Sequence, residues 1–251
     1  LMFLGCPIRM ILRLGGGDLN ALFGIAGFAG GIGFGTIFLK KGYSLQRTYA
    51  LSKLESAMMP AIQVGLLVLV VAAPAFIFFS QKGPGAMHAP WLISLAAGLV
   101  VGGLAQFSRL CTVGGFRDLF LFKKSILIFG YLAVLIGVFV VNISFGNFHL
   151  GFENQPIAHT DGLWNFLGMA LAGFCSVLLG GCPLRQLIMT GEGNSDSAVT
   201  VLGLAAGAAF AHNFGLAASG AGPTLNGEIA VVVGFIVALI IAVVNTKRAN
   251  A

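Results

Sequence analysis

Seven long apolar segments constrain the fold of this chain more than any other feature. They are Leu19–Leu39, Leu54–Phe79, Ala89–Phe107, Ser125–Phe145, Leu163–Leu179, Ala198–Ala218 and Ile229–Val244. A membrane-spanning helix needs about 20 predominantly apolar residues. Only 9% of the residues are charged, against about 25% in soluble domains. This excludes a soluble globular domain, a disordered chain and a nucleic-acid-binding module, and it predicts an all-α polytopic protein in a lipid bilayer.

The connectors between these segments differ in charge. Lys and Arg gather in Lys40–Lys53, in Arg109–Lys124 and in the C-terminal tail, whereas Gly146–Gly162 has two acidic residues and neither Lys nor Arg. If the seven spans alternate, the basic connectors and Arg185 share one face, which the positive-inside rule makes cytoplasmic. The C-terminus is therefore predicted to be cytoplasmic.

A short motif occurs twice. Gly5-Cys6-Pro7-Ile8-Arg9 returns 176 residues later as Gly181-Cys182-Pro183-Leu184-Arg185, and six of the thirteen positions from Gly5 to Gly17 match their counterparts. Five predicted spans separate the copies, so they are expected to enter from opposite faces as an inverted repeat, a frequent transporter architecture. We expect one transmembrane domain, 1–251, made of repeat units at about 1–108 and 109–251.

Each motif copy predicts a short helix that starts at its proline. The helix-compatible stretches, Pro7–Leu14 and Pro183–Thr190, hold eight residues each, a rise of about 12 Å against a membrane core of about 30 Å. They are predicted to be re-entrant half-helices. The cysteine then lies at a helix N-terminus, where N–H groups and the dipole favour anions.

This placement makes Cys6 and Cys182 candidate pathway residues for a soft sulfur- or selenium-containing anion, with Arg9 and Arg185 as flanking cations. The alternative is that the cysteines only pack and the arginines only follow the charge rule. The segment around Cys111 has a similar run of Gly and Arg and reads as a diverged third copy.

Two further residues are candidates for the pathway. Cys175 lies one heptad before Cys182 on the same helix face, where pore lining and simple packing are both open. His212 lies in the outer third of its predicted span, where it either lines the pathway or makes a hydrogen bond between helices.

Several motifs are missing from the sequence. It contains no Walker A sequence and no CxxC or HxxxH pattern, so we expect no ATP hydrolysis, no metal and no cofactor. The motif cysteines, predicted at different faces and spacings, are expected to be free thiols. The chain opens inside an apolar stretch without an initiator methionine, and we expect a further N-terminal portion to precede it.

The paired motif and the stretch Cys111-Thr112-Val113-Gly114-Gly115 resemble the YeeE/YedE sulfur-transport family of bacterial inner-membrane proteins. The stretches Gly181–Asn194 and Ala211–Leu216 are similar to its YedE branch, a group of suspected selenium transporters. The resemblance implies an hourglass-shaped permease in which thiols pass the anion inward, which implicates Cys6, Cys111 and Cys182. It also implies a TusA-like cytoplasmic sulfur-carrier protein as a partner.

Three functions remain open at this point. The first is an inner-membrane permease that imports a small sulfur- or selenium-containing species, such as a selenium compound or a thiosulfate-like anion. The second is a membrane-embedded, thiol-dependent sulfur or selenium transferase. The third is a structural membrane subunit. The sequence distinguishes neither sulfur from selenium nor one driving force from another.

Overall fold

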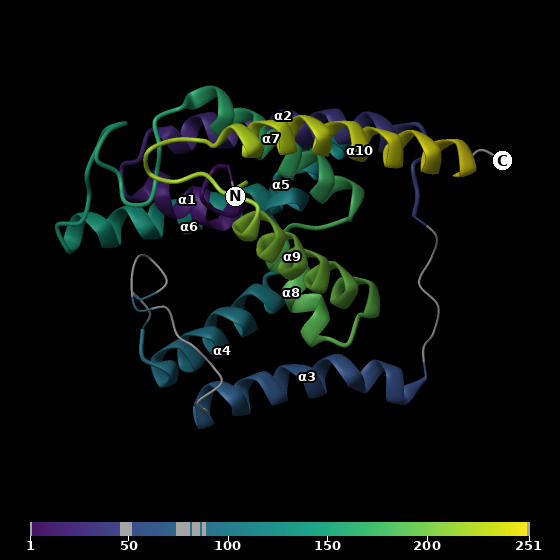
Figure 1. Cartoon of the computed structure of the whole chain (residues 1–251), viewed down its shortest axis with the longest axis horizontal. Coiled ribbons are helices and arrows are strands. Elements are labelled where there is room, and N and C mark those ends of the chain that lie inside the picture. Colours follow the sequence, from purple (N-terminus) through teal and green to yellow (C-terminus); the bar gives the residue numbers. More distant parts are fainter. Residues whose placement is uncertain (1, 46–51, 74–80, 82–85, 87–88, 250–251) are drawn as a thin grey trace. The chain divides into compact units, whose positions relative to one another are not determined.

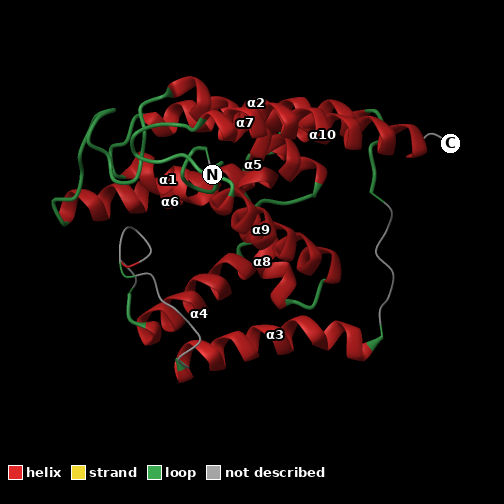
Figure 2. Ribbon diagram, viewed as in Figure 1, coloured by secondary structure: helices red, strands yellow, loops and turns green. Residues whose placement is uncertain are grey.

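The computed structural model describes residues 2–45, 52–73, 81, 86 and 89–249, and these residues form helices and loops (Figure 2). This confirms the all-α prediction. The helices are α1 (Pro7–Gly15), α2 (Asn20–Lys40), α3 (Lys53–Ala72), α4 (Trp91–Phe107), α5 (Thr112–Phe122), α6 (Ile126–Ser144), α7 (Gly162–Leu178), α8 (Pro183–Gly191), α9 (Ser195–Asn213) and α10 (Leu225–Ala249).

Among the described residues, five helical segments are long and apolar enough to cross a membrane, fewer than the seven spans expected of the whole chain. They are Asn20–Lys40, Trp91–Phe122, Ile126–Ser144, Gly162–Gly191 and Leu225–Thr246. The predicted span Ala198–Ala218 becomes α9, which starts with Ser195 and Asp196 and is rich in small residues, so its hydropathy is low. Of the predicted span Leu54–Phe79, the described part contains a shorter apolar helix, Ala57–Ala72. Positions 74–79 of that span lie outside the described residues, and so do positions 46–51 of the basic connector Lys40–Lys53.

The chain divides into two compact units. The first unit comprises Leu1–Arg47, Leu110–Arg185 and Gly203–Ala251, and it contains all three cysteine motifs. The second comprises Thr48–Arg109 and Gln186–Leu202. Many large apolar side chains on α3 and α4 of the second unit are exposed, as is expected for helices that contact lipid.

Close packing of α2 against α7 organises the first unit, and both helices lie beside α10 (Figure 1). Gly27, Gly31 and Gly35 form a stripe along α2 at the i, i+4 spacing. A Cβ at Gly31 would overlap the carbonyl of Ala170, and one at Gly27 would overlap the carbonyl of Phe166. Small residues at such an interface let two backbones approach closely, which explains part of the glycine content of this chain.

The two motif copies fold alike over a longer stretch than their sequence identity indicates. Helices α1 and α8 both have nine residues and keep the offset of 176. Each helix is followed by a glycine with positive φ, +99° at Gly17 and +87° at Gly193. The next residue, Asp18 or Asn194, then accepts a backbone N–H at the start of the following helix. The repeat therefore includes the turn into α2 and α9; the opposite orientation of the copies stays a prediction.

Candidate functional site

Each of the three motif cysteines directly precedes a short helix. Cys6 is the N-cap of α1 and Cys111 is the N-cap of α5, while Cys182 comes immediately before α8. The Cys111 sulfur accepts the backbone N–H of Gly114 at 3.3 Å. The predicted position of these thiols at helix N-termini is confirmed, and it places them where unpaired N–H groups point.

Two of these thiols lie close together. The side chains of Cys111 and Cys182 are near enough to interact, and both residues are buried. The backbone N–H groups of Thr112 and Arg185 also lie close to the Cys182 sulfur. Because α5 and α8 both begin here, hydrogen-bond donors from two helix N-termini converge on one sulfur atom. The site therefore favours an electron-rich or anionic group.

This contact differs from the sequence-based expectation, which placed the motif cysteines at different faces and spacings. The two residues are brought together because both belong to one hydrophobic cluster, which also includes Val113 and Tyr131. All four cysteines are free thiols, as predicted.

Sequence reasoning missed two hydroxyl groups beside the thiol pair. Thr112 is fully buried near Cys182, and its hydroxyl has no hydrogen-bond partner among the described residues. Tyr131, on α6, lies close enough to Cys182 for an electrostatic interaction, and its hydroxyl is buried without a hydrogen-bond partner among the described residues. Thr112 could have been found because it directly follows Cys111. Tyr131 could have been found as an isolated phenol in an otherwise apolar span.

Cys6 itself is exposed. The helix that it precedes does reach the region of the thiol pair, because Met10 and Ile11 of α1 belong to the same hydrophobic cluster as Cys111 and Cys182. Arg9 folds back over Gly5, whose added Cβ would lie 2.7 Å from the Arg9 Cδ. Arg9 therefore packs against the start of its own motif, and the backbone N–H of Arg185 lies close to Cys182; the role of both arginines as flanking cations stays a prediction.

A buried ion pair fixes the segment before Cys6. The Arg13 Nε donates to Asp18 Oδ2 at 2.6 Å, and Arg13 Nη1 donates to the carbonyl of Phe3 at 2.5 Å. Asp18 Oδ1 accepts both the backbone N–H and the side-chain amide of Asn20, each at 2.9 Å. Burial lowers the pKa of Arg13, and the hydrogen bond and charge of Asp18 oppose that shift. The pair therefore keeps the guanidinium charged and anchors the approach to Cys6.

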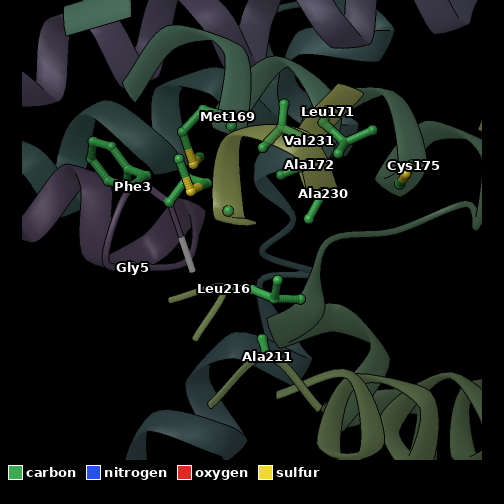
Figure 3. Close-up of a pocket in the computed structure, with 13 residues that line it drawn as sticks. Phe3, Gly5, Met169, Leu171, Ala172, Cys175, Ala211, Leu216, Ala230 and Val231 are labelled. Atoms are coloured by element: carbon green, nitrogen blue, oxygen red, sulfur yellow. The ribbon is translucent and has the colours of Figure 1, made fainter. Parts of the chain in front are cut away.

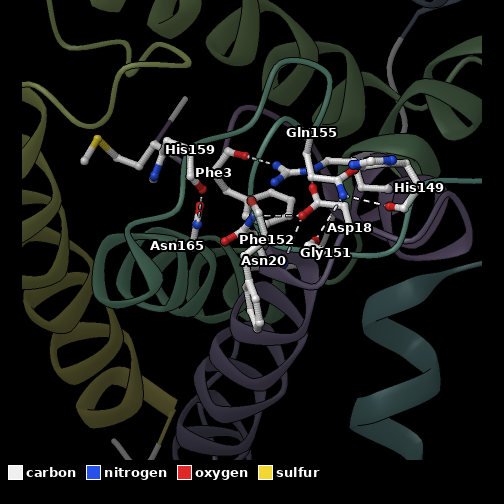
Figure 4. A network of polar contacts seen from close by, with 11 residues as sticks. Phe3, Asp18, Asn20, His149, Gly151, Phe152, Gln155, His159 and Asn165 are labelled. Atoms are coloured by element: carbon white, nitrogen blue, oxygen red, sulfur yellow. Dashed lines mark hydrogen bonds and ion pairs between the residues drawn. The ribbon is translucent and has the colours of Figure 1, made fainter.

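The loop between α6 and α7 closes over this ion pair (Figure 4). Leu19 N–H donates to Gly151 O, and the Asn20 amide donates to Phe152 O. Farther along the loop, the ring of the buried His159 contacts the carbonyl of Met2 at 2.8 Å. This contact joins the loop to the N-terminal segment that precedes α1.

Cys175 lies away from the thiol pair, in the wall of an apolar cavity of about 270 Å³ (Figure 3). Met2 and Met169 line the same cavity, so three sulfur-containing side chains border it, and Gly5 connects it to the first motif. His212 is exposed, and it is the neighbouring Ala211 that lines this cavity. Among the described residues, no group of three or more His, Cys, Asp and Glu is placed to hold a metal ion.

Comparison with known protein families identifies the family to which this chain belongs. The profile of a protein family described as Sulphur transport matches residues 107–250, which is more than half of the chain and includes Cys111, Cys175 and Cys182. This chain belongs to the sulphur-transport (YeeE/YedE) family. It is a multi-pass membrane protein by the length and composition of its helices. No curated protein and no solved structure matched it.

For this member of the sulphur-transport family, the matched region holds both halves of the thiol pair. A sulfur species is therefore the substrate class that the family implies. The first motif, with Cys6 and Arg9, precedes the matched residues.

Proposed function

We propose that this chain is an inner-membrane permease, with a cytoplasmic C-terminus, that imports a small sulfur- or selenium-containing anion along a pathway of cysteine thiols. The observation that carries the proposal is the close, buried pair of Cys111 and Cys182, located where two short helices begin. Membership of the sulphur-transport family supports the same substrate class.

The donors around Cys182 supply a chemical reason for transport. A terminal sulfur or selenium atom of a thiosulfate-like anion is large and polarizable, and it can accept weak hydrogen bonds from the S–H and N–H groups around Cys182. The Thr112 and Tyr131 hydroxyls lie beside that position. Buried donors of this kind replace the hydration shell that an anion loses on entry.

The remaining predicted pathway residues extend the proposal in both directions. In this proposal, Cys6 and Arg9 contact the anion earlier along the pathway, at the start of α1, and Arg185 adds positive charge at α8. Cys175 contributes a thiol to the neighbouring apolar cavity, and His212 is the outermost candidate. Facilitated passage followed by trapping on a cytoplasmic acceptor, such as a TusA-like sulfur carrier, completes the proposed import without an intramembrane acid.

Uptake by cells that lack their own importers tests the proposal. Labelled thiosulfate and labelled selenium compounds are offered to cells that express the wild-type chain, Cys182→Ala, Cys182→Ser or Cys111→Ala. We expect Cys182→Ala to reduce uptake at least tenfold. Cys182→Ser keeps the size and a hydrogen-bonding group but replaces sulfur by hard oxygen, so we expect it to fail as well.

The control variants are Cys175→Ala and His212→Ala, for which we expect smaller losses because both residues lie outside the thiol pair. All variants are compared at equal abundance in the membrane. Unchanged uptake in Cys182→Ala and Cys111→Ala would refute a thiol-dependent permease. It would favour the view that the cysteines have only a structural role.

The same thiol contact supports a second candidate, a sulfur transferase. A Cys182 thiolate could attack the outer sulfur of thiosulfate, so that a new S–S bond forms, the bond to the sulfonate sulfur breaks, and sulfite leaves with the electron pair. Cys111 lies close enough to hydrogen-bond the resulting persulfide. Sulfite release by purified protein in detergent, without uptake by cells, would favour this reaction over transport.

A further inference from the structure

A polar cavity of about 450 Å³ lies in the first unit, and no cysteine is among its lining residues. It is bordered by α1, by the end of α6 and by the loop that follows α6. Eight of its eleven lining residues have polar side chains. Seven of the eight carry N–H donors, and two of these, Asn142 and Gln155, donate to backbone carbonyls. The other five are Arg9, Arg13, Asn147, His149 and Asn154.

Two guanidinium groups in the wall have unused donors. Arg13 is more than nine-tenths buried, and its Nη2 has no hydrogen-bond partner among the described residues although Nε and Nη1 are both engaged. The Nε of Arg9 is also buried without a partner in the described part of the chain. A buried donor without an acceptor is destabilising, and more so when it is charged, so these groups favour a ligand that supplies acceptors.

The charge of the wall is positive. Asp18 is the single carboxylate among the lining residues, and hydrogen bonds from Arg13 and Asn20 occupy both of its oxygens. Asp18 therefore offsets Arg13, and the charge of Arg9 is left without a counter-charge in the wall. Glu153, the next acid along the loop, is exposed and does not line the cavity. A cation would be repelled here, and an anion would be attracted.

We propose that this cavity is an oxyanion-binding site, distinct from the thiol pair, in which Arg9 and the free Nη2 of Arg13 hold a tetrahedral oxyanion with help from Asn147 and Asn154. Arginine recognises such groups through its fork of N–H donors. A role in capturing the transported anion rests on the proposed permease function, whereas binding itself does not. The oxyanion is either a free ion, such as thiosulfate or sulfate, or the phosphate of a lipid headgroup.

Calorimetric titration of the purified chain in a neutral maltoside detergent tests the proposal, with thiosulfate, sulfate and chloride as probes. We expect saturable binding of thiosulfate and sulfate, and weaker binding of chloride. Arg9→Gln is expected to weaken oxyanion binding by 10- to 100-fold, the range for losing about 1.5–3 kcal/mol of charged hydrogen bonds. Arg117→Gln removes one positive charge beside Asp118, outside the cavity, and is expected to change binding less than twofold.

The double variant Cys111→Ala/Cys182→Ala separates this site from the pathway. Binding that survives in the double variant and is lost in Arg9→Gln supports the proposal even where uptake fails. Binding that survives in Arg9→Gln and is lost in the cysteine variant overturns it and assigns the ion to the thiols. Absence of saturable oxyanion binding to the wild-type chain also overturns it.

Addition of phosphatidylglycerol to the micelles distinguishes the two sources. If the lipid phosphate is the ligand, the lipid competes with sulfate, and wild-type protein retains more of it through purification than Arg9→Gln does. If the free ion is the ligand, the lipid leaves the affinity for sulfate unchanged. Each outcome keeps the same cavity and the same two arginines as the site.

Discussion

Oxidation of the purified protein is expected to join Cys111 to Cys182. The two thiols already lie close together, so we expect a mild oxidant such as diamide to remove two protons and two electrons and form a disulfide. Cys175 lies in a separate cavity and Cys6 is exposed, so neither is expected to take part. Uptake should fall on oxidation and recover with dithiothreitol, because the bond consumes both thiols of the proposed pathway.

The crosslink should also raise the stability of the protein. It closes a loop of about 70 residues, for which the chain-entropy relation gives about 4 kcal/mol. For a chain of this length, that corresponds to an increase in melting temperature of roughly 8–16 °C. We expect this increase in melting temperature to be an upper limit, because helices that persist in the detergent-unfolded chain reduce the entropy that the crosslink removes.

Thiol counting and thermal unfolding in detergent check this prediction together. After oxidation, a maleimide reagent of known mass should modify two thiols fewer in the unfolded chain. Cys175→Ala serves as the control that keeps the crosslink, and Cys111→Ala should abolish both the loss of thiols and the rise in melting temperature. An oxidised wild-type chain in which Cys111 and Cys182 remain reactive would refute the contact on which the proposed pathway depends.

Two further predictions concern the packing of the first unit, and both are read from thermal unfolding in detergent. Asp18→Asn leaves the buried Arg13 guanidinium without its counter-charge and is expected to lower the free energy of unfolding by about 3–5 kcal/mol. The double variant Arg13→Met/Asp18→Asn should recover part of that stability. Equal losses of stability in the single and double variants would contradict the ion-pair explanation. Gly31→Ala forces a Cβ into the carbonyl of Ala170 and is expected to cost about 1–3 kcal/mol. Gly98→Ala, where a Cβ meets nothing within 4 Å, should be neutral or slightly stabilising, so matching destabilisation at Gly31 and Gly98 would argue against the close approach of α2 and α7.

The local parts of the site were predictable from the sequence because they follow from short-range rules. A proline after Gly-Cys fixes the first turn of a helix, and the structure places helix starts at Pro7 and Pro183. The number of candidate spans was harder to predict, because Ala- and Gly-rich α9 has the length of a span without its hydropathy.

The sequence alone determined that this is a helical membrane protein and that Cys6 and Cys182 lie at helix starts, because hydropathy and helix initiation depend on residues close together in the chain. Only the tertiary structure decided that Cys111 meets Cys182, that Thr112 and Tyr131 stand beside them, and that Arg9 and Arg13 share a cavity. These contacts join positions far apart in the chain. Their register is set by side-chain and glycine packing between helices, which no local pattern in one sequence specifies.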